Sequence, residues 1–176
     1  MARKMFLTGR PGCGKTTVIQ KTLDRLTDFA GGFSTREIRS GSGRLGFRVT
    51  DLRSGEEGVL AHVDRKGGPR VSKYGVDLAE FERIGVGALR DALERDGVIV
   101  IDEVGKMELF SDAFRATVTD ALESDQPVVG TITRSQHEFV ERIKARADVE
   151  VVSVTKSNRD GLPERLARDL GGGGSG

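Results

Sequence analysis

Hydrophobic residues along this 176-residue chain fall into short blocks, and their spacing alternates between that of strands and that of helices. The first block, residues 5–8 (MFLT), is a short apolar run typical of a buried strand. From residue 15 to residue 26, Ile19, Leu23 and Leu26 recur at helical spacing. This segment therefore predicts an amphipathic helix directly after a strand and a glycine-rich loop.

A different pattern occupies residues 33–63. Three strand-like pieces, GFSTREIR, RLGFRVTDL and GVLAHV, are separated by the turn-rich pieces SGSG and RSGEEG. This arrangement predicts an antiparallel meander. The basic, glycine-rich residues 64–76 that follow are predicted to form an exposed loop.

Helices and strands alternate through the second half of the chain. Asp77 and Glu80 have the spacing of a capping box at the start of a helix. The apolar residues after them recur at helical spacing: Leu78, Phe81, Ile84, Ala88, Leu89 and Ala92. Residues 98–101 (VIVI) form a continuous apolar run, as expected for a central parallel strand covered on both faces. Further helices are predicted at 111–123, 135–147 and 161–170, with strands at 127–133 and 149–154.

Strands that alternate with helices imply right-handed crossovers and a mainly parallel, three-layer α/β sheet. The meander would extend one side of that sheet. We expect residues 1–170 to form a single domain. The tail 171–176 (GGGGSG) has the composition of a flexible linker and is left out of the fold prediction.

Composition narrows the classes of function. Charged residues make up 31% of the chain, but the net charge is only about +1, and no basic block indicates a polyanion or membrane partner. Aromatic residues make up 5%, which speaks against stacking on single-stranded nucleic acid. The lone Cys13 excludes an internal disulfide. No segment has the length of a membrane span or the pattern of a signal peptide, so a cytoplasmic protein is expected.

The strongest chemical signal is the phosphate-loop pattern Gly9-x4-Gly14-Lys15-Thr16. Its glycines allow backbone N–H groups to turn inward, and the positive end of the following helix points at the same place. Lys15 would reach the β- and γ-phosphates, and the Thr16 hydroxyl would ligate Mg²⁺. The predicted nucleotide-binding residues of the loop are Gly9, Arg10, Pro11, Gly12, Cys13, Gly14, Lys15, Thr16 and Thr17.

A second motif, VIVIDEVGKME, places two carboxylates after the central strand. Asp102 would emerge at the carboxyl edge of the sheet, where ligands bind in open α/β sheets, and would hold Mg²⁺ together with Thr16. Glu103 would orient or deprotonate the water that attacks the γ-phosphate. Because a kinase must exclude water from the γ-phosphate, Glu103 favours hydrolysis over transfer.

Polar side chains follow two further strands. Thr131 and Thr133 fall near the γ-phosphate edge, and Arg134 is either an arginine finger that completes the catalytic set with Lys15 and Glu103 or a solvated arginine. Asn158 and Arg159, in TKSNRD, are predicted to contact the base and ribose. Asn158 equally suits the start of the last helix, and the two roles are compatible.

Together the motifs FLTGRPGCGKTT, GFSTREIR, IDEVGKMELFSDAF, GTITR and VTKSNRD resemble those of the small nucleoside-triphosphatases of thermophilic microbes and animals, over residues 3 to about 170. The resemblance implies a RecA-like P-loop NTPase fold. It also implies slow, Mg²⁺-dependent hydrolysis of ATP, GTP and other nucleoside triphosphates such as CTP and UTP to the diphosphate. By position, Lys15 and Thr16 take the phosphate and magnesium roles, Asp102 the metal role, and Glu103 the water-activating role.

Two rival functions remain open at this point. The first is a nucleotide or small-molecule kinase, whose lid would be the loop 64–76. The second is a nucleotide-dependent switch or an RNA-associated ATPase, which the near-neutral charge disfavours. A monomer is expected. Base preference and the chemistry of the stretch from Gly105 to Glu108 are not legible in the sequence.

Overall fold

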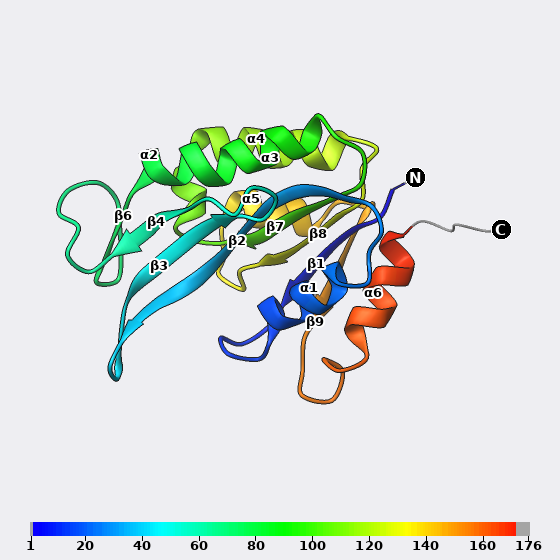
Figure 1. Ribbon diagram of the computed structural model, residues 1–176, viewed down its shortest axis with the longest axis horizontal. Helices are drawn as coiled ribbons and strands as arrows, with labels where there is room; N and C mark the ends of the chain where they lie inside the picture. The colour runs from blue at the N-terminus through cyan, green and yellow to red at the C-terminus, as the bar shows by residue number, and fades with distance from the viewer. Residues whose placement is uncertain (1, 172–176) are drawn as a thin grey trace.

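The computed structural model describes residues 2–171, and the strands of this part form one sheet with helices on both faces (Figure 1). The strand order across the sheet is β5-β6-β4-β3-β2-β7-β8-β1-β9. In chain order the elements are β1 (Lys4–Thr8), α1 (Lys15–Leu23), β2 (Phe29–Ser40), β3 (Gly43–Asp51), β4 (Glu57–His62), β5 (Arg70–Val71), β6 (Tyr74–Val76), α2 (Leu78–Phe81), η1 (Glu82–Val86), α3 (Gly87–Leu93), β7 (Val98–Val104), η2 (Glu108–Phe110), α4 (Asp112–Glu123), β8 (Val128–Ile132), α5 (Glu138–Lys144), β9 (Val149–Ser153) and α6 (Leu162–Leu170).

The long strand β2 joins a parallel half of the sheet to an antiparallel half. Its first residues, Phe29–Phe33, pair in parallel with β7, and Phe33–Ser40 pair antiparallel with β3. The meander was predicted to start only at residue 33, so the sequence prediction missed the parallel part. The reason is Gly32, because glycine has a low strand propensity and so argues against a strand at this position. The structure nevertheless requires glycine here, since a Cβ would lie 2.0 Å from the carbonyl oxygen of Val100. Close approach of two backbones therefore requires glycine in this strand.

Two helical layers enclose the parallel strands. Helices α2, α3, α4 and α5 cover one face, and α1 and α6 cover the other (Figure 1). Along β7, Ile99 and Ile101 belong to the first core, whereas Val98 and Val100 belong to the second. This alternation explains the continuous apolar run, because each neighbouring side chain is buried against a different layer.

The first core is centred on three phenylalanines. Phe33 packs edge-on against Phe81 at 5.5 Å and against Phe114 at 5.9 Å, and the last two rings lie 5.2 Å apart. These rings come from β2, α2 and α4. The contacts fix the helical layer on the sheet, and so hold the carboxyl end of β7 in place.

Two further predictions need correction. The segment 64–76 is not loop throughout, because β5 and β6 pair with each other and β6 pairs with β4. These strands are too short to leave a periodic pattern. The helix expected after Asp77 is interrupted by a π-helical turn, η1. Asp77 accepts the expected hydrogen bond from Glu80 N at 3.0 Å, but the Glu80 side chain binds Arg83 and so does not close the capping box.

The other predicted helices and strands are found. The helices, β8 and β9 are shorter than predicted, whereas β1 and β7 are longer. Within residues 2–171, no helix has the length and apolar character needed to cross a membrane. Apart from Gly171, the predicted tail lies outside the described residues.

We expect Lys4→Met to destabilise the fold strongly. Lys4 is 3% exposed, and its ammonium group donates to the carbonyls of Ala121 (3.1 Å), Ser124 (2.7 Å) and Gln126, in and just after the last turn of α4. Methionine keeps the apolar stem but removes the donor that Lys4 supplies to these carbonyls, at a cost of about 2–4 kcal/mol. Urea unfolding measures the effect. Lys21→Met, at an exposed lysine on α1, is the control, and an equal loss in both variants would contradict the assignment.

Candidate functional site

The loop between β1 and α1 has the geometry of an anion cradle. Gly14 precedes α1 in the left-handed conformation, with φ 102°, which L side chains rarely adopt. Lys15 Nζ donates to the carbonyl oxygen of Gly9 at 2.8 Å, so the ammonium group lies across the loop. The first N–H groups of α1 have no intrahelical acceptor and point toward the same space. Backbone donors, the helix terminus and the Lys15 charge therefore converge where a phosphate would bind.

Asp102 connects this loop to the centre of the sheet. It lies within β7, is 3% exposed, and accepts hydrogen bonds from Thr131 Oγ1 at 2.7 Å and Thr16 Oγ1 at 3.1 Å. Burial raises the pKa of its carboxyl, while these two hydrogen bonds and the charge of Lys15 act in the opposite direction. Thr131 thus contacts Asp102, a contact that the sequence did not indicate.

The pair formed by Thr16 and Asp102 fits Mg²⁺. A hydroxyl and a carboxylate are hard oxygen donors, and their oxygens approach to 3.1 Å across the cradle. Among residues 2–171, no group of three or more His, Cys, Asp or Glu side chains is arranged to hold a metal. The ion would therefore depend on phosphate and water oxygens for its remaining ligands, as is usual for Mg²⁺ in triphosphate sites.

Glu103 faces the same space as the loop. A cavity of about 440 Å³ is lined by Gly9, Pro11, Lys15, Glu103, Thr133, Arg134 and Ser135. Burial raises the pKa of the Glu103 carboxyl, and the neighbouring charge of Asp102 raises it further, while Lys15 opposes both. A carboxylate with a raised pKa beside a phosphate cradle has the properties of a general base.

The stretch from Gly105 to Glu108, which the sequence left without a role, packs against Glu103. A Cβ on Gly105 would lie 2.7 Å from Glu108 Oε2 and 2.8 Å from Glu103 Cγ, so only glycine lets both side chains approach. Glu108 is 4% exposed, and burial followed by the charge of Glu103 raises the pKa of its carboxyl well above the usual value. A second buried acid therefore lies beside Glu103, and no local sequence pattern indicates that Glu108 is buried.

We expect Glu108→Gln to raise the thermal stability of the free protein at neutral pH. The folded state raises the pKa of this carboxyl well above its ordinary value of 4.5, so between the two pKa values the folded chain holds a proton that the unfolded chain has already released. Below pH 4.5 the Glu108 carboxyl is protonated in both states and does not lower the free energy of unfolding. The free energy of unfolding then falls as the pH rises from 4.5 toward the raised pKa. Glutamine resembles the protonated acid without this cost.

Differential scanning calorimetry would detect a gain in Tm of about 2–4 °C at pH 7, the shift that ~1 kcal/mol gives in a chain of this size. The gain should disappear near pH 4. Glu94→Gln, at an exposed glutamate, is the matched control. A gain that does not depend on pH would contradict the explanation.

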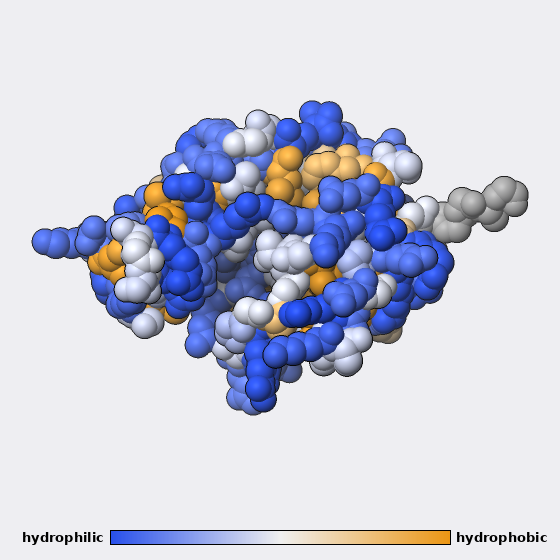
Figure 2. Space-filling model, turned by 60° about the horizontal axis from the view of Figure 1, so that its bottom comes forward, coloured by the Kyte–Doolittle hydropathy of each residue, from blue (hydrophilic) through white to orange (hydrophobic). Residues whose placement is uncertain are grey.

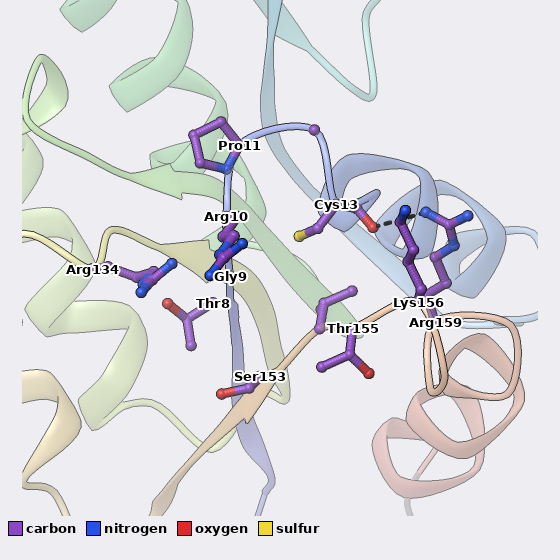
Figure 3. Close-up of a pocket in the computed structure, with 12 residues that line it drawn as sticks. Thr8, Gly9, Arg10, Pro11, Cys13, Arg134, Ser153, Thr155, Lys156 and Arg159 are labelled. Carbon is purple, nitrogen blue, oxygen red and sulfur yellow. Dashed lines mark hydrogen bonds between the residues drawn. The ribbon is translucent and has the colours of Figure 1, made fainter.

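A larger cavity lies on the outer side of the loop (Figure 3). It measures about 580 Å³, and its lining includes residues 8–13, Arg134, residues 153–156 and Arg159. Among the described residues, Thr8 Oγ1 is the one buried side-chain polar atom without a hydrogen-bond partner, and Thr8 lines this cavity. Such an atom suits a polar ligand.

The two arginines predicted to act here approach the loop from opposite sides. In Figure 3 the exposed side chain of Arg134, which follows β8, extends toward Gly9 and Arg10. Arg159 Nη1 lies 3.4 Å from the carbonyl oxygen of Cys13, to which it donates. Arg159 also lines a cavity of about 380 Å³ together with Gly14, Thr17, Lys21 and others. The structure thus brings both arginines to the loop.

Asn158 has a different environment. Its Oδ1 accepts from Thr155 N at 2.8 Å, and its Nδ2 donates to the carbonyl oxygen of Ser153 at 2.8 Å. The side chain thereby closes the loop between β9 and α6 and holds Arg159 in position. A contact with the base would have to be made in addition to these bonds.

The site lies on a hydrophilic face. Figure 2 brings forward the lower edge of Figure 1, which carries the loop 9–14. Apolar patches on this face are small, and the surface is hollowed near its centre. A polar hollow at the carboxyl edge of a parallel sheet is the usual place for a nucleotide.

Comparisons with known proteins agree with this geometry. A family model described as NTPase matches residues 4–167. Nucleoside-triphosphatase THEP1 of Thermofilum pendens is 47% identical over 174 residues, which cover 96% of each protein. Nucleoside-triphosphatase THEP1 of Thermotoga petrophila is 48% identical over 163 residues, covering 93% of this chain and 90% of that protein.

Solved structures show the same architecture. The crystal structure of THEP1 from Aquifex aeolicus has a TM-score of 0.84 at 34% identity, covering 95% of this chain and 98% of that one. The solution structure of a human cancer-related nucleoside triphosphatase has a TM-score of 0.79 at 40% identity, covering 95% and 96%. The predicted P-loop NTPase fold is thereby confirmed, and the chain belongs to the NTPase family of these nucleoside-triphosphatases.

Proposed function

We propose that this enzyme hydrolyses nucleoside triphosphates to the diphosphate and phosphate, with Mg²⁺, broad base tolerance and slow turnover. The observation that carries the proposal is the shared cavity of Lys15 and Glu103. Lys15, which would bind the γ-phosphate, and Glu103, which would bind the attacking water, thus line the same cavity. This arrangement favours in-line attack by water.

The chain's own residues divide the work. The backbone of residues 9–14 and Lys15 bind and orient the phosphates. Thr16 and Asp102 would hold Mg²⁺, which neutralises charge on the β- and γ-phosphates when bound. Glu103 takes the proton from the attacking water at its carboxylate, as the bond to the γ-phosphorus forms and the bond to the β-phosphate oxygen breaks.

Two features support slow turnover and broad base tolerance. No hydrogen bond or ion pair within residues 2–171 holds Arg134, so this candidate for charge stabilisation is not preorganised. The two cavities that adjoin Arg159 have no aromatic side chain in their described lining. A base would therefore meet few groups that distinguish one ring from another.

The rival kinase function has less support. Its lid would be the segment 64–76, but Arg65 pairs with Asp77 at 3.0 Å, and β5 and β6 tie the segment to the sheet. Arg70 is bonded to the carbonyls of Arg65 and Lys73, each at 2.9 Å. These bonds hold the segment rather than leave it free to close over phosphates.

Phosphate release tests the proposal. ATP, GTP, CTP and UTP are each incubated with the protein and Mg²⁺ in the absence of any acceptor, and again with excess EDTA. We expect release from all four nucleotides with Mg²⁺ and almost none with EDTA. Release that requires an added acceptor would instead establish the kinase function, and turnover of one base alone would contradict broad tolerance.

A further inference from the structure

A second groove adjoins the nucleotide site and contains none of the phosphate-loop residues. It measures about 390 Å³. Its lining is Arg70 and Val71 on β5, Lys106, Leu109 and Phe110 after β7, and Thr133, Ser135, Gln136 and His137 after β8. We call it the amphiphilic groove. Thr133 and Ser135 line both this groove and the cavity that contains Lys15 and Glu103. The two spaces are therefore neighbours.

One part of the amphiphilic groove is apolar. Val71, Leu109 and Phe110 line it, and Phe110 is 44% exposed. Among residues 2–171, Phe110 and Val59 are the two exposed large hydrophobic residues. An exposed ring on the wall of a concave space is typical of a ligand pocket, because occupancy removes the ring from water.

The rest of the lining is cationic or neutral. Arg70 donates to two backbone carbonyls and makes no ion pair, and Lys106 has no hydrogen bond or ion pair to any described residue. The lining includes no carboxylate, and Thr133 and residues 135–137 add hydroxyl, amide and imidazole groups. Two positive charges without anionic partners beside an apolar wall match an anion that carries an apolar group.

We propose that the amphiphilic groove binds a small organic anion, with an aromatic or aliphatic body against Phe110 and a phosphate or carboxylate beside Lys106 and Arg70. Its volume lies within the roughly 300–1,000 Å³ of small-molecule pockets. This ligand is distinct from the nucleotide, and its binding does not depend on hydrolysis. Such a ligand would sit next to the γ-phosphate cavity without entering the phosphate loop.

The test uses ¹⁹F NMR titrations of 4-fluorophenyl phosphate and 4-fluorobenzoate into the protein saturated with Mg²⁺ and nucleoside diphosphate, which occupies the loop. We expect saturable binding of at least one probe, and the stronger one identifies the head group. Neutral 4-fluorobenzyl alcohol, titrated in the same way, and inorganic phosphate, measured by competition with the stronger probe, should each bind at least about fivefold more weakly. The alcohol lacks the anionic group and phosphate lacks the apolar body.

Two variants locate the probe. Phe110→Ser and Lys106→Gln should each weaken binding by about fivefold or more, whereas the matched variants Val59→Ser and Lys66→Gln should not. Thermal unfolding verifies that all four proteins are folded. Equal affinity in all four variants, or a probe displaced by raising the nucleotide concentration, would overturn the assignment. Phosphate release is measured separately, so failure of the groove and failure of the proposed hydrolysis are distinguishable.

Discussion

Glu103→Gln is expected to lower kcat for nucleoside-triphosphate hydrolysis by about 10²–10⁴-fold, the usual contribution of a general base. Glutamine keeps the size and the burial of the side chain but cannot accept the proton of the attacking water. Affinity for Mg²⁺-nucleotide should stay equal or increase, since a negative charge beside the γ-phosphate is removed. Phosphate-release kinetics give kcat, and titration with a fluorescent nucleotide gives Kd.

The pH profile makes this prediction more specific. Glu103 must be ionised to act, and burial and Asp102 raise the pKa of its carboxyl. Wild-type activity should therefore fall as the pH is lowered through that raised pKa, at a higher pH than an exposed glutamate would give. The small residual activity of Glu103→Gln should lack this limb. Glu94→Gln is the matched control, and near-normal turnover of Glu103→Gln would remove the residue from the mechanism.

The parallel core of the fold was predictable because its signals are local. Continuous apolar runs such as residues 98–101 occur where a strand is covered on both faces, and β7 lies at the centre of the sheet. The first part of β2 was not predictable in this way. Gly32 is required by the approach of β7, a partner more than sixty positions along the chain. Strands β5 and β6 were missed because two or three residues cannot show a period.

The candidate site likewise has a part that local sequence predicts and a part that depends on the fold. The phosphate loop is contiguous in sequence, so its residue types and spacing carry the prediction by themselves. The contacts around Asp102 come from Thr16 and Thr131, 86 and 29 positions away, and only the sheet brings them together. Glu108 is five positions after Glu103, but its burial depends on how η2 packs under β7.

The resulting cluster of acids explains why the loop lysine matters for more than phosphate binding. Burial raises the pKa values of Asp102, Glu103 and Glu108. The charge of Asp102 further opposes the ionisation of Glu103, and the charges of Glu103 and Asp102 oppose that of Glu108. Lys15 is the cation that opposes this effect at both Asp102 and Glu103. It therefore favours the ionised forms that metal binding and water activation need.

Lys15→Ala is accordingly expected to weaken nucleoside-triphosphate binding by about tenfold to a hundredfold, the loss of one hydrogen-bonded charge pair. Loss of the ammonium group also removes its bond to the Gly9 carbonyl and raises the pKa values of both acids further. The acid limb of the residual activity should therefore move to higher pH. Isothermal titration calorimetry with a slowly hydrolysed triphosphate analogue gives Kd.

Lys66→Ala, in the exposed segment before β5, has the same change in net charge and is the control. The diphosphate should lose less affinity than the triphosphate in Lys15→Ala, because the lysine contacts the γ-phosphate as well as the β-phosphate. Lys15→Ala and Glu103→Gln therefore differ in the quantity that changes. The first should mainly weaken nucleotide binding, and the second should mainly lower kcat. A Lys15→Ala protein that binds the nucleoside triphosphate normally but does not hydrolyse it would show that other residues of the loop bind the phosphates.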